Sequence, residues 1–291
     1  MFLFVLNAGS QVRFVDSLIY INTITVPHNY PVMGTQVYEI SGIEYSGNGS
    51  QYLLLPQTKH KSYLYLCTIE LEGFLVNYHF DGIVPFNAGG FEGESIRRRP
   101  GTSDLYLTDE NADSKVYHLD KSGDLVLVYK SEIPLTENSG FEGMCFNDDG
   151  DKLYLSYERT SDPYETTIVE FDLDSGKTRN YSYKLDMVYG DRKNDNGISE
   201  ILWIGKNSVL VIERAWLGRD AGTSVRVYRA TFPETGNEMI KSGLITNFSF
   251  IRNLDNVEGV SFSASGNELY FITDNNGSKR QETQIICMKI Q

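Results

Sequence analysis

The chain has 291 residues, enough for one large all-β domain or two smaller domains. Its formal charge of −13 comes from 26 Lys and Arg against 39 Asp and Glu, which argues against nucleic acid or acidic membranes as partners. Aromatic residues make up 12% of the chain and only 8 residues are proline, so ordered strands are favoured over disorder.

The first ten residues are apolar and then small. They lack a basic start and are too short for a complete signal peptide or a membrane span. Residues 1–10 therefore fit either the end of a truncated signal peptide or an extra N-terminal strand, and we expect no insertion into a membrane.

A hairpin-like unit recurs five times along the chain. One copy is FEGMCFNDDGDKLYLSYER at residues 141–159, in which two apolar segments flank a tight turn. This pattern predicts a β-hairpin whose outer ends lie together. The first segment of each unit opens with a small or acidic residue followed by a glycine. These glycines are spaced 50 to 62 residues apart: Gly42, Gly93, Gly143, Gly197 and Gly259.

Further apolar segments follow each hairpin, so each unit has the size of a four-stranded propeller blade. The predicted third strands span residues 63–71, 115–119, 167–173, 224–230 and 284–290. The predicted fourth strands span residues 74–80, 125–129, 179–185 and 244–251.

The last unit ends after its third strand, and residues 11–21 form an apolar segment without a hairpin of its own. Pairing this N-terminal strand into the last blade would close the ring and remove exposed edges. We therefore predict an all-β, single-domain propeller over residues 1–291 with five four-stranded blades. A sixth blade in the longer steps is left open.

The start of the first strand and the end of the second strand of each blade should lie at one mouth of the central channel. The residues at the start of the first strands are Ser41, Glu92, Glu142, Asn196 and Glu258. Those at the end of the second strands are Gln57, Glu110, Glu158, Glu213 and Asp274.

Carboxylates at this density raise one another's pKa unless a cation lies among them, so a metal ion is a natural solution. Oxygen ligands without Cys or His favour Ca²⁺ over zinc, with Mg²⁺ or Mn²⁺ as alternatives. The candidate metal ligands are Glu92, Glu142, Glu258, Asp274 and Asn196. The alternative is structural, in which the Glu side chains cap neighbouring blades or pair with arginines.

Two arginines follow acidic residues at equivalent strand ends, and guanidinium groups in such positions could bind a phosphate or carboxylate. The candidate catalytic residues are Glu142, Glu158, Glu213, Arg159 and Arg214. The candidate substrate-binding residues are Arg159, Arg214, Arg192 and Trp216, the last two from loops next to this mouth. By contrast, we interpret the basic run at residues 97–99 as a solvated turn on the opposite face.

Several segments together resemble the phytase-like β-propeller family, described as "esterase-like activity of phytase". They are SGIEY (41–45), FEG (91–93 and 141–143), NGISEI (196–201), LVIER (210–214), VRVYR (225–229), NVEGVSF (256–262) and YFITDNN (270–276). The resemblance covers nearly the whole chain and implies a secreted or periplasmic propeller with phosphoesterase-type activity, although a cytoplasmic location is left open. The first unit departs from the family pattern, because residues 55–58 contain no acid.

These observations favour a monomeric, metal-dependent hydrolase of a phosphate ester or similar small anionic ester, with its site at the channel mouth. A lactonase-like hydrolase with a metal on Glu142, Asn196 and Asp274 is one alternative. A non-catalytic propeller that binds a glycan, peptide or protein is another, so the sequence leaves open whether the protein is an enzyme.

Overall fold

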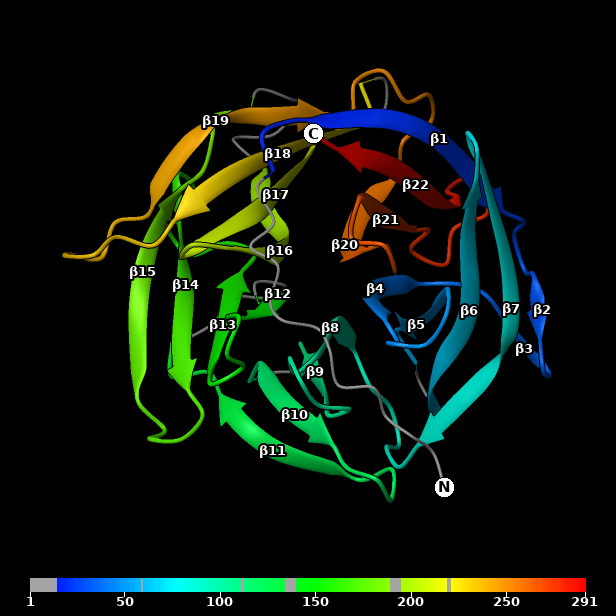
Figure 1. The fold of residues 1–291 in the computed structure, drawn as a ribbon, viewed down its shortest axis with the longest axis horizontal. Coiled ribbons are helices and arrows are strands. Elements are labelled where there is room, and N and C mark those ends of the chain that lie inside the picture. Colours follow the sequence, from blue (N-terminus) through cyan, green and yellow to red (C-terminus); the bar gives the residue numbers. More distant parts are fainter. Residues whose placement is uncertain (1–14, 59, 111–112, 134–139, 189–194, 219–220) are drawn as a thin grey trace.

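The computed structural model describes residues 15–58, 60–110, 113–133, 140–188, 195–218 and 221–291. In these ranges the chain forms β-strands and no helix, and five four-stranded sheets stand like blades around a central axis (Figure 1). The predicted five-bladed propeller is therefore confirmed. No helix in the described ranges has the length and apolarity needed to cross a membrane.

Four blades are continuous in sequence, and each runs from an inner strand at the channel to an outer strand at the surface. Blade 1 consists of β4 (Ile40–Tyr45), β5 (Gln51–Pro56), β6 (Ser62–Glu72) and β7 (Leu75–Phe86). Blade 2 consists of β8 (Gly93–Arg98), β9 (Leu105–Asp109), β10 (Lys115–Leu119) and β11 (Leu125–Lys130). Blade 3 consists of β12 (Phe141–Phe146), β13 (Lys152–Tyr157), β14 (Glu165–Asp172) and β15 (Thr178–Lys184). Blade 4 consists of β16 (Asn196–Gly205), β17 (Ser208–Trp216), β18 (Thr223–Thr231) and β19 (Ile240–Asn247).

Blade 5 joins the two ends of the described chain. It consists of β20 (Asn256–Phe262), β21 (Glu268–Asp274), β22 (Thr283–Ile290) and β1 (Leu18–Val26), and β1 pairs antiparallel with β22 (Figure 1). This confirms closure by an N-terminal strand, although β1 begins and ends later than the predicted segment. A short hairpin of β2 (Pro31–Val32) and β3 (Thr35–Gln36) lies outside the blades.

Inner strands of adjacent blades approach so closely at the axis that glycine is required there. A Cβ atom on Gly143 of β12 would lie 2.7 Å from the backbone nitrogen of Ile201 in β16. A Cβ atom on Gly259 of β20 would lie 2.9 Å from the carbonyl oxygen of Ser41 in β4. At Gly143 and Gly259 the recurring glycine is thus explained by backbone contact between blades, whereas a Cβ atom on Gly93 would meet the side chains of Phe91 and Leu55.

Each inner strand also contains a register shift against its second strand. In β12, Phe141 pairs with Tyr157 and Gly143 pairs with Ser156, so Glu142 has no partner residue opposite it. Such a bulge re-aims the extra side chain. Corresponding shifts lie next to Ser41, Glu94, Ser199 and Glu258.

Apolar side chains fill the space between blades and leave the polar ones at the axis. The fully buried residues next to the glycine level include Ile43, Ile96, Ile201 and Val260. The three cysteines, Cys67, Cys145 and Cys287, are free and buried as well. Side chains at the channel are therefore held on a rigid ring of strands.

Candidate functional site

Six carboxylates gather at the channel mouth where the inner strands begin and the second strands end. We call this group the acidic mouth: Glu94, Glu110, Glu142, Glu158, Glu258 and Asp274. Their electrostatic interactions link blades 2, 3 and 5, and Arg214 adds blade 4. The structure thus brings together the predicted residues Glu142, Glu158, Glu258 and Asp274.

Blade 2 contributes a different glutamate from the predicted one. Glu92 is exposed, whereas Glu94 is only 5% exposed and accepts a hydrogen bond from Gln57 Nε2 at 2.7 Å. The bulge in β8 lies after Gly93, whereas the bulge in β12 lies before Gly143. The repeated Glu-Gly pair therefore marks different register positions in the two blades.

Blade 4 differs in a similar way. The backbone N–H of Glu158 bonds to Gly140 just before β12, and Arg214 occupies the matching position beside Gly197. Because successive strand residues face opposite sides, Glu213 points away from Arg214. Arg214 therefore takes the place at the acidic mouth that the sequence pattern predicts for Glu213.

Glu213 and Asn196 lie in a separate buried cluster. Glu213 accepts hydrogen bonds from Asn196 Nδ2 at 2.6 Å, from Tyr183 Oη at 2.9 Å and from Lys241 Nζ at 2.5 Å. Lys241 also pairs with Asp186. The predicted set of Glu142, Asn196 and Asp274 is therefore not assembled by these contacts, since the Asn196 amide is bonded to Glu213 and to the Asp186 carbonyl.

Both predicted arginines contact the acidic mouth. Arg214 donates to Glu258 Oε1 and to Glu158 Oε1, the latter at 3.3 Å. Arg159 donates to Glu158 Oε2 at 2.9 Å and also pairs with Asp195. Glu158 therefore holds one arginine on each carboxylate oxygen, and the positive charge of both arginines is already matched by carboxylates.

Burial raises the pKa of several carboxyl groups of this mouth. Burial raises the pKa of Glu258 to about 8, against the opposing effect of Arg214. Burial, together with the charge of Glu39, raises the pKa of Asp274 to about 7. The pKa of Glu142 and that of Glu94 are raised well above the usual range. Burial is the larger cause, and repulsion from neighbouring carboxylates is the smaller one. Neutral, proton-bearing acids are thus present near pH 7.

One of these groups still has bonding capacity within the described part of the chain. The Oε2 atom of Glu258 is buried without a hydrogen-bond partner there. However, no three or more His, Cys, Asp or Glu side chains in the described ranges are arranged to hold a metal ion. The described side chains as placed do not fit a preformed metal site, and Ca²⁺ stays a prediction.

The remaining predicted substrate-binding residues are not part of this group. Arg192 lies outside the described residues. Trp216 is at the end of β17, is 44% exposed, and pairs with Thr223 of β18. Its role in substrate binding stays a prediction.

The interpretation of Arg97 as part of a solvated turn is wrong. Arg97 is in β8, is only 4% exposed, and pairs with Glu200 of β16 at 2.7 Å. Glu200 also accepts hydrogen bonds from Ser95 Oγ at 2.9 Å and from the Met144 backbone at 3.0 Å. Burial raises the pKa of Glu200 to about 7, against the effect of Arg97.

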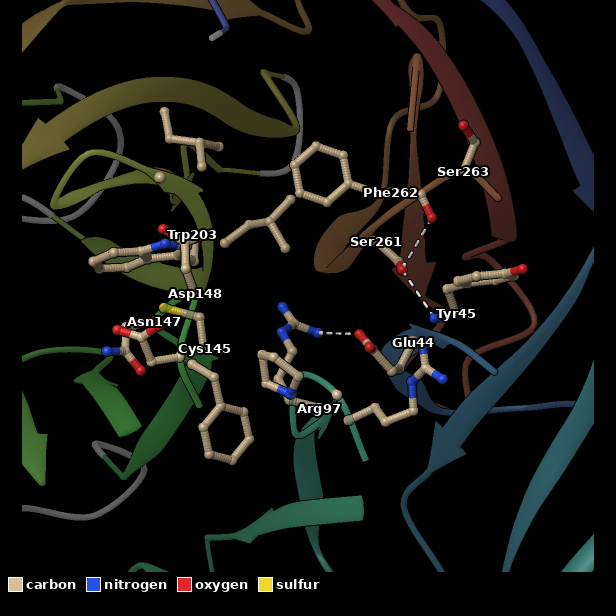
Figure 2. Close-up of a pocket in the computed structure, with 18 of the residues that line it drawn as sticks. Glu44, Tyr45, Arg97, Cys145, Asn147, Asp148, Trp203, Ser261, Phe262 and Ser263 are labelled. Carbon is tan, nitrogen blue, oxygen red and sulfur yellow. Dashed lines mark hydrogen bonds and ion pairs between the residues drawn. The ribbon is translucent and has the colours of Figure 1, made fainter. Parts of the chain in front are cut away.

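This ion pair crosses the channel between blades 2 and 4. The run of three arginines hid it, because Arg97 is buried whereas Arg98 and Arg99 are partly exposed, and the sequence does not separate the three. On the side of the ion pair away from the acidic mouth, the hairpin turns of the blades surround a cavity of about 840 Å³ (Figure 2). We call it the opposite cavity.

The fold and the site define a five-bladed propeller with an acidic channel mouth. A family model described as "Phytase-like: Esterase-like activity of phytase" matches residues 35–277, and the chain belongs to this family. No curated protein matches the sequence.

Solved structures match the chain at low sequence identity. A GH43 β-1,3-galactosidase matches with a TM-score of 0.58 and 14% identity, over 91% of this chain and 60% of that one. U3-55K matches with a TM-score of 0.48 and 8% identity, over 94% of this chain and 100% of that one. A putative oxidoreductase (glucose dehydrogenase) from Thermus thermophilus matches with a TM-score of 0.46 and 10% identity, over 93% of this chain and 100% of that one. At 14% identity the likeness to the galactosidase concerns the fold alone.

Proposed function

We propose that the protein hydrolyses a small anionic ester, with phosphate esters as the first class to test, at the acidic mouth. The observation that carries this proposal is Glu258, a buried acid with a pKa of about 8 that is bonded to an arginine. Family membership supports a hydrolase of this type. Strongly perturbed acids next to cationic groups are typical of catalytic sites.

The chemistry needs a proton donor, a proton acceptor and an anion-binding group. Protonated Glu258 would donate a proton to the leaving oxygen as its bond to phosphorus or carbon breaks. A second carboxylate, Glu158, would accept the proton of the attacking water. Arg159, which is 31% exposed, would turn from Asp195 towards the substrate anion.

Calcium is the finer part of this proposal. A divalent cation would compete with protons for the raised-pKa carboxyl groups, and the unpartnered Glu258 Oε2 is the atom best placed to gain from it. Since the described side chains form no ready metal site, cation binding would require Glu142 or Glu258 to turn. No step above depends on it.

The test uses the purified full chain, first stripped with a chelator and then assayed with and without Ca²⁺. The substrates are para-nitrophenyl phosphate, phytate, para-nitrophenyl acetate and a lactone panel. We expect turnover of at least one phosphate ester, and Glu258→Gln should reduce it about 100-fold because a general acid is lost. Glu72→Gln, an exposed glutamate on β6, is the matched control.

Two results would count against the proposal. If no ester is hydrolysed with any cation, the protein is better described as a binding propeller. If hydrolysis occurs but Glu258→Gln and Arg214→Lys retain it fully, the acidic mouth is not the site.

A further inference from the structure

The opposite cavity is separated from the acidic mouth by the Arg97–Glu200 pair, and nothing above gives it a role. We propose that it binds a neutral sugar, either free or at the end of a glycan. Its size is within the range of pockets that take ligands larger than a single ion. Three properties of its lining carry this proposal: its charge, its hydrogen-bonding groups and its aromatic walls.

The charge of the lining disfavours an anion. Glu44, Asp148 and Asp149 line the cavity beside Arg97 and Arg98. The charge of Arg97 is already matched by Glu200 at 2.7 Å, so the lining retains a surplus of negative charge. The charge therefore excludes an anion and leaves a neutral or a cationic ligand. The hydrogen-bonding groups and the aromatic walls select the neutral ligand, and a cation is one outcome of the test.

The residues that line the cavity include buried donors and an acceptor. Arg97 Nε and Trp203 Nε1 are buried N–H groups without a hydrogen-bond partner among the described residues. The Glu44 carboxylate lies 3.8 Å from Arg97 Nη1, and Figure 2 shows the two side chains directed towards each other across the floor. A hydroxyl group both donates and accepts, so adjacent hydroxyls of a sugar match this combination.

Four blades each supply one aromatic side chain to the wall. These aromatic residues come from the inner strands of blades 1, 3, 4 and 5: Tyr45, Phe146, Trp203 and Phe262. Trp203 is fixed by stacking on Tyr154, with ring centroids 5.3 Å apart. Figure 2 shows Tyr45 and Trp203 on opposite sides of the cavity. Rigid aromatic faces of this kind can cover the C–H surface of a sugar ring.

Tryptophan fluorescence gives a direct test, because the chain has only two tryptophans, Trp203 and Trp216. In a Trp216→Phe background, the emission reports Trp203 in the opposite cavity alone. The probes are glucose, galactose, N-acetylglucosamine, cellobiose and lactose, compared with inorganic phosphate and putrescine. We expect a saturable emission change with at least one neutral sugar and none with phosphate or putrescine.

Glu44→Gln in the same background should weaken sugar binding about tenfold, because a charged acceptor is replaced by a neutral one. The matched control Glu72→Gln should leave it unchanged. Saturation-transfer NMR, with irradiation of aromatic protons, checks the contact in the Trp216→Phe protein without any change to the floor. The proposal is overturned if no neutral sugar gives saturable emission or transfer, if phosphate or putrescine binds there instead, or if folded Glu44→Gln binds the sugar normally.

Discussion

Arg214 of blade 4 and Glu258 of blade 5 form an ion pair at the acidic mouth, and the same guanidinium also reaches Glu158 of blade 3. One side chain thus links three consecutive blades. It is largely buried, with 16% of the side chain exposed. The link therefore has consequences for stability as well as for chemistry.

At about pH 9, above the pKa of about 8 of Glu258, Arg214→Met should destabilise the protein by about 3–5 kcal/mol, because it leaves two buried carboxylates without their shared cation. Urea unfolding followed by far-UV circular dichroism measures this. Arg159→Met is the matched control at a more exposed arginine, and its cost should stay below about 1 kcal/mol. Equal losses for the two variants would show that Arg214 is not the link described above.

Stability should fall as the pH rises from about 5 to 8. The folded chain holds protons on Glu258 up to a pKa of about 8 and on Asp274 up to about 7, against ordinary values of 4.5 and 3.8. In this window the folded state therefore binds more protons than the unfolded state, so the free energy of unfolding decreases with pH. Each such proton contributes at most about 1.4 kcal/mol per pH unit.

The pH effect can be assigned with a variant. The glutamine side chain in Glu258→Gln does not titrate. Urea unfolding at a series of pH values should therefore show a free energy of unfolding that changes less with pH than in the wild type. Glu72→Gln should keep the wild-type slope. A wild-type stability that rises steadily from pH 5 to 8 would contradict the assignment.

If Ca²⁺ binds at the acidic mouth, it should displace protons. Calorimetric titration at pH 7 in two buffers of different ionisation enthalpy should then give different apparent heats, since carboxyl groups must ionise to bind the metal. Glu142→Gln should weaken the binding, because a neutral amide replaces a candidate carboxylate ligand. No heat from a chelator-stripped sample would remove Ca²⁺ from the proposed function.

Much of the fold follows from the sequence, because the apolar segments reflect contacts within each blade and the repeated glycine reflects the close approach of adjacent blades. The closing strand was also predictable, since the last unit lacked a fourth strand. The site was harder to predict. The position of a bulge has no fixed sequence signal, so Glu94 lies where Glu92 is expected, two residues further along, and Arg214 lies where Glu213 is expected, one residue further along.

Long-range ion pairs were beyond sequence-based prediction for another reason. Arg97 and Glu200 are far apart in the chain, and only the closed ring brings them together across the channel. Neither residue has a neighbour in sequence that indicates its partner.

Glu200→Leu should cost about 3–5 kcal/mol in unfolding free energy, because Arg97 would be left buried without its carboxylate. Glu44→Gln should cost less, since Glu44 lies 3.8 Å from Arg97 and is more exposed than Glu200. Chemical denaturation of the two variants under the same conditions measures the difference. If Glu44→Gln proved the more damaging, Glu44 would be the principal partner of Arg97.

The close approach of the inner strands predicts a strong effect of one added methyl group. In Gly143→Ala, the new Cβ atom would lie 2.5 Å from Ser156 Oγ and 2.7 Å from the Ile201 backbone nitrogen. The serine hydroxyl could move, but the backbone of blade 4 could do so only by separating from blade 3. We expect a loss of about 1–3 kcal/mol.

The matched control for this prediction is Gly89→Ala. A Cβ atom there would meet no atom within 4 Å, so the change should stay within about 0.5 kcal/mol. Gly143→Ala combined with Ser156→Ala would relieve the contact with the hydroxyl but not that with the backbone, and should recover only part of the loss. Full recovery in the double variant would mean that Ser156, and not the contact between blades 3 and 4, requires glycine at this position.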